Sequence, residues 1–190
     1  MTKNPPFLIF EGAELSGKSF IMSQIYNHLE PKYNTGGRRL NGCVWFNTDV
    51  GIYGGKHSAL VMERFIDIAE HITDRPVMFE KFHISDIVYF NIYKNQKIQY
   101  NEYEKRLKKL NAKIIFCSID EDEALFEHRL KDRLNLYPHY IKIAQTPKEY
   151  IAQQQIYKQI IKKSSLPVLP INSSVLPNDK IIKDIINWIS

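Results

Sequence analysis

The sequence has few of the features that mark secreted, disulfide-rich or membrane proteins. Cys43 and Cys117 are its two cysteines among 190 residues, and both fall inside apolar runs. They are expected to be small buried thiols in a reducing compartment, and nothing in their positions argues for a disulfide. No apolar run approaches the roughly 20 residues that a membrane-spanning helix needs. Met1 leads through two prolines into the first apolar run, which leaves no room for a signal peptide. We therefore expect a cytoplasmic protein without a membrane partner.

The chain also lacks internal repeats, linkers and low-complexity segments. With 44% hydrophobic residues it is long enough for one sizeable core and short for two, so residues 1–190 are predicted to form a single domain. The net charge is +5, but the Lys and Arg residues are scattered, with short clusters only at 38–39, 105–109 and 162–163. We interpret these clusters as solvated faces. An anionic small substrate explains the positive balance at least as well as nucleic acid, which is not the expected partner.

Short apolar segments alternate with amphipathic helical patterns along the whole chain. The predicted strands are 7–10, 43–46, 77–79, 114–119 and 168–171, and their continuous hydrophobicity suits strands covered on both faces. The helical stripes comprise Ile21, Ile25 and Leu29; Val61, Phe65, Ile68 and Ile72; Tyr150, Gln154, Tyr157 and Ile161; and Ile182, Ile185, Ile186 and Ile189. This alternation predicts an α/β fold with a doubly wound, five-stranded parallel sheet and helices on both faces. Ligands of such sheets bind beyond the carboxyl ends of the strands.

The segment after the first predicted strand matches the pattern Gly-x-x-x-x-Gly-Lys-[Ser/Thr] and is followed by a helical stripe. Two glycines permit a tight loop, whose N–H groups converge at a helix N-terminus that favours negative charge. A lysine adds charge for the β- and γ-phosphates, and the final hydroxyl can hold Mg²⁺. The sequence therefore predicts a site for a nucleoside triphosphate. Its residues are Gly12, Ala13, Glu14, Leu15, Ser16, Gly17, Lys18 and Ser19.

Carboxylates follow two further strands. Asp49 comes after the second predicted strand, and Glu80 follows the third with Lys81 directly behind it. These side chains are candidates for a catalytic base and for a ligand to Mg²⁺-bound water. Polar residues also end strands in any α/β protein, so for Asp49 the two interpretations stay equally open.

Four segments carry a resemblance to a known family. Phe7 to Ser19 resembles the opening of thymidylate kinases and the related deoxynucleoside kinases, which place Phe-Glu-Gly before the rest of the phosphate loop. Glu80 to Tyr89 is similar to the thymidylate kinase segment that runs Asp-Arg-Tyr, then Ser, then an aromatic residue. Ile119 to Arg133 looks like the stretch that leads into the lid, with an acidic turn, Ala-Leu and Arg-x-x-x-Arg. Pro170 to Ser174 resembles the loop that cradles adenine. The likeness spans nearly the whole chain in the correct order.

The resemblance implies ATP and Mg²⁺ as cofactors and a small helical lid at about 129–146. Because the phosphate loop contains no Arg, the charge that neutralises the transferred group is expected from the lid, and Arg129 is also expected against adenine. The implied catalytic residues are Lys18, Lys81, Arg129, Arg133 and Asp49, with Asn172 near the adenine and Ser19 and Glu80 at the metal. The implied acceptor-binding residues are Glu11, Asp49, Arg64, Phe65, Glu80, Lys81, Ser85 and Tyr89.

Two departures from the family pattern leave the acceptor open. Lys81 stands where an Arg is expected, and Thr48 to Gly51 replaces Glu-Pro-Gly-Gly. The leading hypothesis is a nucleoside monophosphate kinase acting on dTMP or a related deoxynucleotide. A deoxynucleoside kinase with Asp49 as general base is the first alternative. A nucleotide-binding module without catalysis is the second, and a homodimer also stays open.

Overall fold

The computed structural model describes residues 5–37, 39–48 and 53–190, so Asp49 lies outside the described residues. Its strands are β1 (Phe7–Glu11), β2 (Val44–Asn47), β3 (Val77–Glu80), β4 (Ala112–Ser118) and β5 (Val168–Asn172). The α-helices are α1 (Lys18–Tyr33), α2 (Ser58–His71), α3 (His83–Lys94), α4 (Asn101–Lys109), α5 (Glu123–Leu136), α6 (Pro147–Ile161) and α7 (Asp179–Ile189), and η1 (Pro138–Lys142) is a 3-10 helix.

The five strands form one parallel sheet in the order β2-β3-β1-β4-β5. β1 is central, with Phe7 beside Val77 of β3 on one side and beside Ala112 of β4 on the other. All five residues of β1 are buried, as the apolar run predicts for a strand covered on both faces. Each predicted strand is present, and its ends differ from the prediction by one or two residues.

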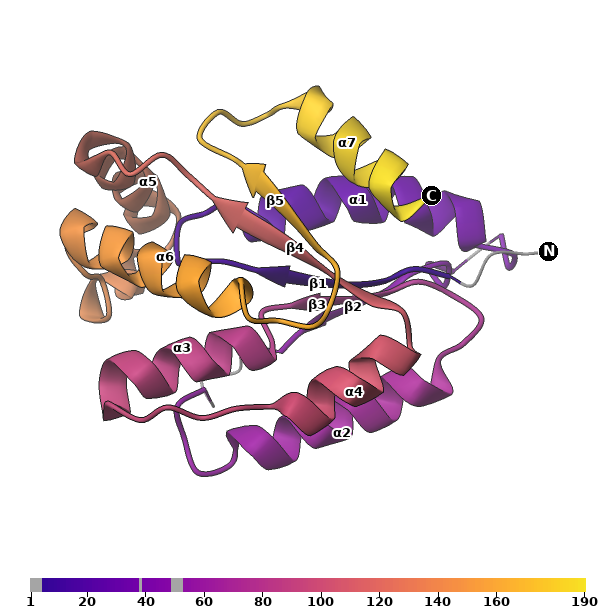
Figure 1. The fold of residues 1–190 in the computed structure, drawn as a ribbon. Coiled ribbons are helices and arrows are strands. Elements are labelled where there is room, and N and C mark those ends of the chain that lie inside the picture. The colour runs from indigo at the N-terminus through magenta and orange to yellow at the C-terminus, as the bar shows by residue number, and fades with distance from the viewer. Residues whose placement is uncertain (1–4, 38, 49–52) are drawn as a thin grey trace.

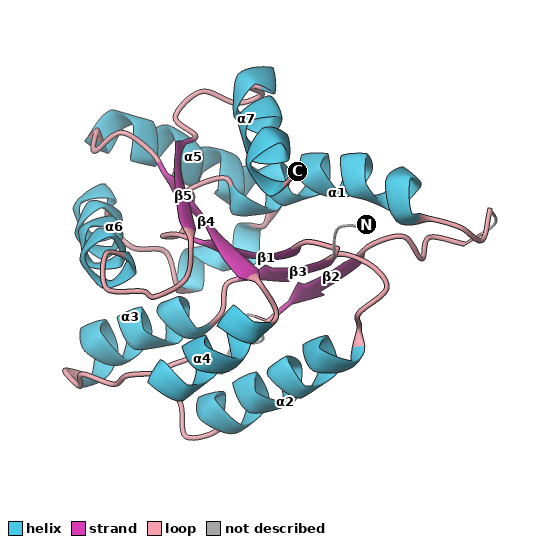
Figure 2. Cartoon of the chain, turned by 45° about the vertical axis from the view of Figure 1, so that its right-hand side comes forward, coloured by secondary structure: helices cyan, strands magenta, loops and turns pink. Residues whose placement is uncertain are grey.

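Helices cover both faces of the sheet (Figures 1 and 2). α1 and α7 pack on one face over Leu8, Phe10 and Ile115, whereas α2, α3, α4 and α6 pack on the other over Ile9 and Phe79. The strand arrows in Figure 1 point toward the end of the molecule where α5 and α6 lie. The loops that follow β1 and β3 therefore open at this end, where the sequence places its polar residues.

The helical stripes are mostly confirmed. Tyr150, Gln154, Tyr157 and Ile161 are all buried on α6, and Asn178 accepts hydrogen bonds from Lys180 N and Ile181 N at the start of α7. The stripe on α2 is only partly confirmed. Phe65 and Ile72 pack against the core, but Ile68 is exposed, and the buried apolar residues are Met62, Ile66 and Ala69. The segment has apolar residues on several faces, and the sequence does not reveal which of them the sheet covers.

Two helical segments differ from the expectations. α4 was not predicted, because its single buried residue, Leu107, leaves almost no apolar stripe to detect. The segment 134–145 has no clear period in the sequence, yet α5 continues to Leu136 and η1 follows directly.

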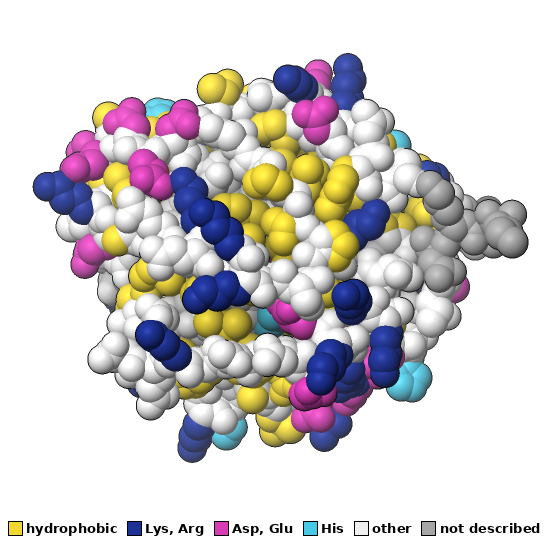
Figure 3. Space-filling view, viewed as in Figure 1, with side chains coloured by type: hydrophobic (Ala, Val, Ile, Leu, Met, Phe, Trp, Pro, Cys, Tyr) yellow, Lys and Arg dark blue, Asp and Glu magenta, His cyan; other side chains and the backbone are white. Residues whose placement is uncertain are grey.

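The surface agrees with the interpretation of the cationic clusters. Figure 3 shows Lys and Arg side chains dispersed over one face, with Asp and Glu gathered over the region of α5. Cys43 and Cys117 are buried free thiols. Among the described residues, no helix is both long and apolar enough to cross a membrane.

Candidate active site

The predicted phosphate loop connects β1 to α1. Gly12 and Gly17 have φ angles of 146° and 75°, which L side chains rarely adopt. A Cβ built on Gly12 would lie 2.2 Å from the carbonyl oxygen of Cys117, so β4 also excludes a side chain there. α1 begins at Lys18, and the loop therefore ends at a helix N-terminus as the motif requires.

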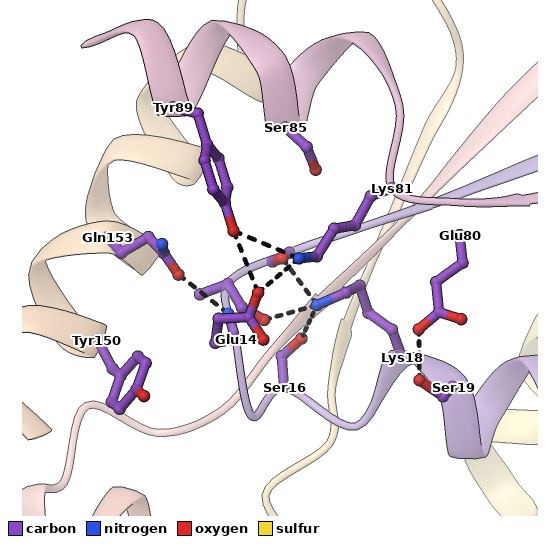
Figure 4. Close-up of polar contacts among 12 residues, drawn as sticks. Glu14, Ser16, Lys18, Ser19, Glu80, Lys81, Ser85, Tyr89, Tyr150 and Gln153 are labelled. Carbon is purple, nitrogen blue, oxygen red and sulfur yellow. Dashed lines mark hydrogen bonds and ion pairs between the residues drawn. The ribbon is translucent and has the colours of Figure 1, made fainter. Parts of the chain in front are cut away.

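The ammonium of Lys18 occupies the concave side of this loop (Figure 4). Its Nζ donates hydrogen bonds to Gly12 O at 2.9 Å, to Ala13 O at 2.6 Å and to Ser16 Oγ at 3.3 Å. Burial and the nearby charge of Lys81 both lower the pKa of Lys18. Because the partners are mainly neutral carbonyl oxygens, an anionic phosphate oxygen would be a stronger partner for this cation.

The two residues predicted at a metal site are in contact. Ser19 is the second residue of α1, and its hydroxyl donates a hydrogen bond to Oε1 of Glu80 at the end of β3. A hydroxyl and a carboxylate oxygen are hard ligands of the kind that Mg²⁺ prefers. The residues present therefore fit a Mg²⁺ ion shared with bound phosphates.

A partly buried ion pair lies on the other side of the loop. Lys81 Nζ lies 2.5 Å from Glu14 Oε1, and the hydroxyl of Tyr89 lies 3.2 Å from the same carboxylate oxygen and 3.4 Å from the ammonium. Burial opposes ionisation of Glu14, but the charges of Lys81 and Lys18 prevail and lower its pKa to about 2. The Glu14 backbone N–H donates to Oε1 of Gln153 on α6 at 3.0 Å, which fixes the loop from that side.

Arg129 connects three separate segments. From α5 its guanidinium donates to Leu15 O in the phosphate loop at 3.2 Å, to Ser173 O at 2.5 Å and to Ser174 O at 3.1 Å. The side chain of Asn172 donates to Asp120 at 2.7 Å and accepts from the Ser174 hydroxyl. Asn172 therefore shapes the loop after β5, and it does not line either of the cavities described below.

Arg133 lies one turn further along α5. The centre of its guanidinium lies 5.5 Å from the centre of the Tyr137 ring and 5.4 Å from that of Tyr140. Contacts of this kind stabilise a cation without neutralising its charge. Arg133 is thus held at the site by neutral aromatic rings, and its charge stays available for an anionic ligand.

These residues surround a cavity of about 620 Å³, which we call the phosphate cavity. An adjoining tyrosine cavity of about 380 Å³ shares Glu14, Tyr89, Tyr140 and Ile143 with it. The tyrosine cavity is completed by Tyr93, Gln145, Tyr150 and Gln153, and it has no Lys or Arg among the described residues that line it. The phosphate cavity is lined by residues 14–20, Asn47, Glu80, Lys81, Tyr89, Arg129, Asp132, Arg133, Leu136, Tyr137, Tyr140 and Ile143.

Two residues expected at the acceptor lie beneath the site instead. Glu11 is fully buried and accepts hydrogen bonds from Phe82 N at 2.9 Å, Ser85 N at 3.3 Å and Ser85 Oγ at 2.5 Å. Ser85 is likewise fully buried. A carboxylate at the end of a strand can satisfy the free N–H groups of a neighbouring helix, and here that use places both side chains outside the cavities.

Two residues of α2 that were also expected at the acceptor do not line either cavity. Arg64 is exposed and pairs with Asp67 at 2.9 Å on the same helix. Phe65 packs against Phe46 and Phe79, with ring centres 5.6 and 5.7 Å apart. Neither residue lines the cavities, because this turn of α2 faces solvent on one side and the sheet on the other.

Most of the residues that line the tyrosine cavity were not expected there, and Glu14 and Tyr89 are the site residues named from the sequence that do line it. Tyr150 and Gln153 lie on α6, and Gln145 precedes that helix. The apolar periodicity of α6 indicates a core helix and gives no sign that part of it borders a cavity. Tyr140 belongs to a segment without a period. The tyrosines and histidines of 134–145 were the one available signal that this segment borders a site.

Comparison with known proteins identifies the fold. No family model and no curated protein matches the sequence. Among solved structures, the YorR protein of Bacillus subtilis in complex with phosphorylated GDP is 18% identical, with 96% of this chain and 95% of that chain covered and a TM-score of 0.68. Thymidylate kinase from Ehrlichia chaffeensis is 15% identical, with 96% and 97% covered and a TM-score of 0.53. The chain is similar in fold to both proteins, and the expected α/β fold with a five-stranded parallel sheet is confirmed.

Proposed function

We propose that the chain transfers the γ-phosphoryl group of ATP to a nucleoside monophosphate. The observation that carries the proposal is that the two cavities adjoin and share Glu14, the partner of Lys81, in their lining. The phosphate cavity has the cations and the loop geometry of a triphosphate site. The tyrosine cavity has an aromatic lining without Lys or Arg among the described residues, which suits a base. A donor and an acceptor in these cavities would meet beside Lys81.

The donor end has the charges that phosphoryl transfer needs. Lys18 and the N–H groups of the loop would hold the β- and γ-phosphates, and Ser19 and Glu80 would hold Mg²⁺, which neutralises the phosphate oxygens when bound. Arg133 adds a second cation from the opposite wall of the phosphate cavity. Arg129 organises the loops around the nucleotide, since its hydrogen bonds already join the phosphate loop to the segment after β5.

The acceptor end supports a nucleotide by its chemistry. Lys81 contacts Glu14 and the Tyr89 hydroxyl, both of which line the tyrosine cavity, and it can exchange Glu14 for an acceptor phosphate. Tyr93 and Tyr140 offer aromatic faces, and Gln145 and Gln153 offer amides for the edge of a base. The family resemblance makes dTMP the first acceptor to test.

A deoxynucleoside kinase is the second candidate. The observation in its favour is that Lys81 is already paired with Glu14, and no Lys or Arg of the described chain lines the tyrosine cavity. A neutral nucleoside would not need to displace a carboxylate from its cation. Asp49, the proposed general base for that reaction, lies outside the described residues.

Release of ADP separates these functions. The purified protein is given Mg-ATP with each deoxynucleoside and each deoxynucleoside monophosphate in turn, and Lys18→Ala serves as the matched inactive control. Transfer to monophosphates supports the proposal, and transfer to nucleosides alone supports the second candidate. Tight ATP binding without transfer to any acceptor would contradict both and leave a nucleotide-binding module.

A further inference from the structure

We propose that Glu11, the buried carboxylate at the end of β1, is a positioning residue for Lys81. It fixes the peptide directly after Lys81, and this holds the ammonium beside the phosphate loop. The inference rests on the function proposed above, because that function gives Lys81 its role. It replaces the expected contact between Glu11 and the acceptor, which burial of Glu11 excludes.

The backbone of Lys81 needs such support. Its φ angle is 58°, in the left-handed region that a side chain with a Cβ disfavours. A strained conformation of this kind persists only where the surroundings determine it, and it occurs often at functional sites. The backbone N–H of Lys81 donates to Phe10 O at 2.9 Å, and its carbonyl accepts from the hydroxyl of Thr48. These two bonds fix the peptide groups of Lys81 to β1 and to the end of β2.

Glu11 holds the peptide between Lys81 and Phe82 through its N–H. Phe82 N–H, one residue after Lys81, donates to Glu11 Oε1 at 2.9 Å, and Ser85 N–H donates to the same oxygen at 3.3 Å. Glu11 Oε2 accepts the hydroxyl of Ser85 at 2.5 Å. All three partners are donors, so the carboxylate is used on both oxygens. An amide keeps one acceptor oxygen for the two N–H groups, but its NH₂ group cannot accept the Ser85 hydroxyl, which then loses its acceptor.

The same chain of hydrogen bonds reaches a third element. The hydroxyl of Tyr157 on α6 donates to Ser85 Oγ at 2.8 Å, and both groups are buried. β1, the start of α3 and α6 are therefore connected through Glu11. Lys81 lies next to this network. Its side chain lines the phosphate cavity, and Glu11 holds the peptide that follows it.

Glu11→Gln tests the role, with Glu30→Gln as the matched control. Glu30 is also buried, and it accepts the backbone N–H of Cys43 at 2.7 Å in the cluster on the α1 face of the sheet. The first readout is the Cα chemical shift of Lys81 in the ligand-free protein, which reports the left-handed backbone and needs no activity. We expect Glu11→Gln to move this shift toward extended values and Glu30→Gln to leave it unchanged.

The second readout is kinetic coupling to Lys81. Glu11→Gln should lower kcat about tenfold or more while the dissociation constant of Mg-ATP stays within about twofold. In a Lys81→Ala background the same substitution should change kcat by less than about twofold, because the group it positions is gone. A residue with a purely structural role would lower kcat by the same factor in both backgrounds.

The outcomes are distinct. An unchanged Lys81 shift in Glu11→Gln, or equal kcat factors in both backgrounds, overturns the positioning role. Absence of transfer by the wild-type protein overturns the proposed function, and the chemical shift then still decides whether Glu11 holds the Lys81 backbone. If Glu11→Gln does not fold, Ser85→Ala removes one of the three donors, and it should move the Lys81 shift in the same direction by less.

Discussion

The ammonium of Lys81 lies 2.5 Å from the carboxylate of Glu14, so the segment after β3 is joined to the phosphate loop by a partly buried ion pair. Both side chains line the phosphate cavity, and Glu14 also borders the tyrosine cavity. The pair thus stands at the boundary between the proposed donor and acceptor. Any anion that binds there must compete with Glu14 for Lys81, or bind with the pair intact.

The Glu14–Lys81 pair predicts a pH dependence of stability. Lys81 and Lys18 lower the pKa of Glu14 from its ordinary value of 4.5 to about 2 despite burial. A lowered folded-state pKa stabilises the protein above pH 4.5, and this contribution is lost as the pH falls toward 2. The difference corresponds to about 3 kcal/mol as an order of magnitude.

Denaturant unfolding of wild type and Glu14→Gln between pH 7 and pH 2.5 measures this contribution. The free energy of unfolding should differ most at pH 7, with the variant less stable, and the two proteins should converge as the pH falls. Glu102→Gln is the control, because Glu102 forms an exposed pair with Lys105 that is worth little. A difference between wild type and Glu14→Gln that stays constant with pH would contradict the assignment.

The two arginines of α5 should behave differently. Arg133→Ala removes a cation held by aromatic rings, so kcat should fall by roughly two powers of ten with little loss of thermal stability. Arg129→Ala removes three hydrogen bonds between segments, so the melting temperature should fall and the KM for ATP should rise. Lys131→Ala, an exposed position on the same helix, should change neither. A normal kcat in Arg133→Ala would contradict the catalytic role of Arg133.

Removal of Mg²⁺ should abolish transfer, and Glu80→Gln should raise the Mg²⁺ concentration that gives half-maximal rate by about tenfold. The reason is that the Ser19 hydroxyl and the Glu80 carboxylate are the oxygen ligands that the site offers at the proposed metal position. A titration of rate against Mg²⁺ at saturating ATP measures the shift. Glu70→Gln on α2, which does not line the site, should give the same Mg²⁺ titration curve as the wild type. An unshifted curve for Glu80→Gln would contradict the assignment of Glu80 as a metal ligand.

Local features of the fold and the site were predictable from the sequence. The phosphate loop depends on a strand, two glycines and a helix start within 13 residues, and the structure has all of them from Phe7 to Ser19. The contact between Ser19 and Glu80 followed from a rule of topology, since both lie at the carboxyl edge of the sheet. The order of β1 and β3 in the sheet is what brings them together.

Features that depend on which face of a helix is covered were not predictable. The family resemblance placed Phe65 and Arg64 at the acceptor, but Phe65 packs in the core against Phe79 and Arg64 faces solvent. Tyr150 and Gln153 lie on α6, whose apolar periodicity indicates a core helix, yet both side chains line the tyrosine cavity. The family resemblance implied a binding role for Glu11, and only the position of α3 reveals that it caps a helix.

The most direct test follows the γ-phosphoryl group itself. Wild-type protein is incubated with Mg-ATP labelled at the γ-phosphate and with dTMP or another deoxynucleoside monophosphate, and Lys18→Ala is the matched control. The account predicts labelled nucleoside diphosphate from the wild type, and a loss of at least 10² in rate for Lys18→Ala because Lys18 stabilises charge on the transferred group. Equal rates in both proteins, or label that appears only in free phosphate with every acceptor, would contradict it.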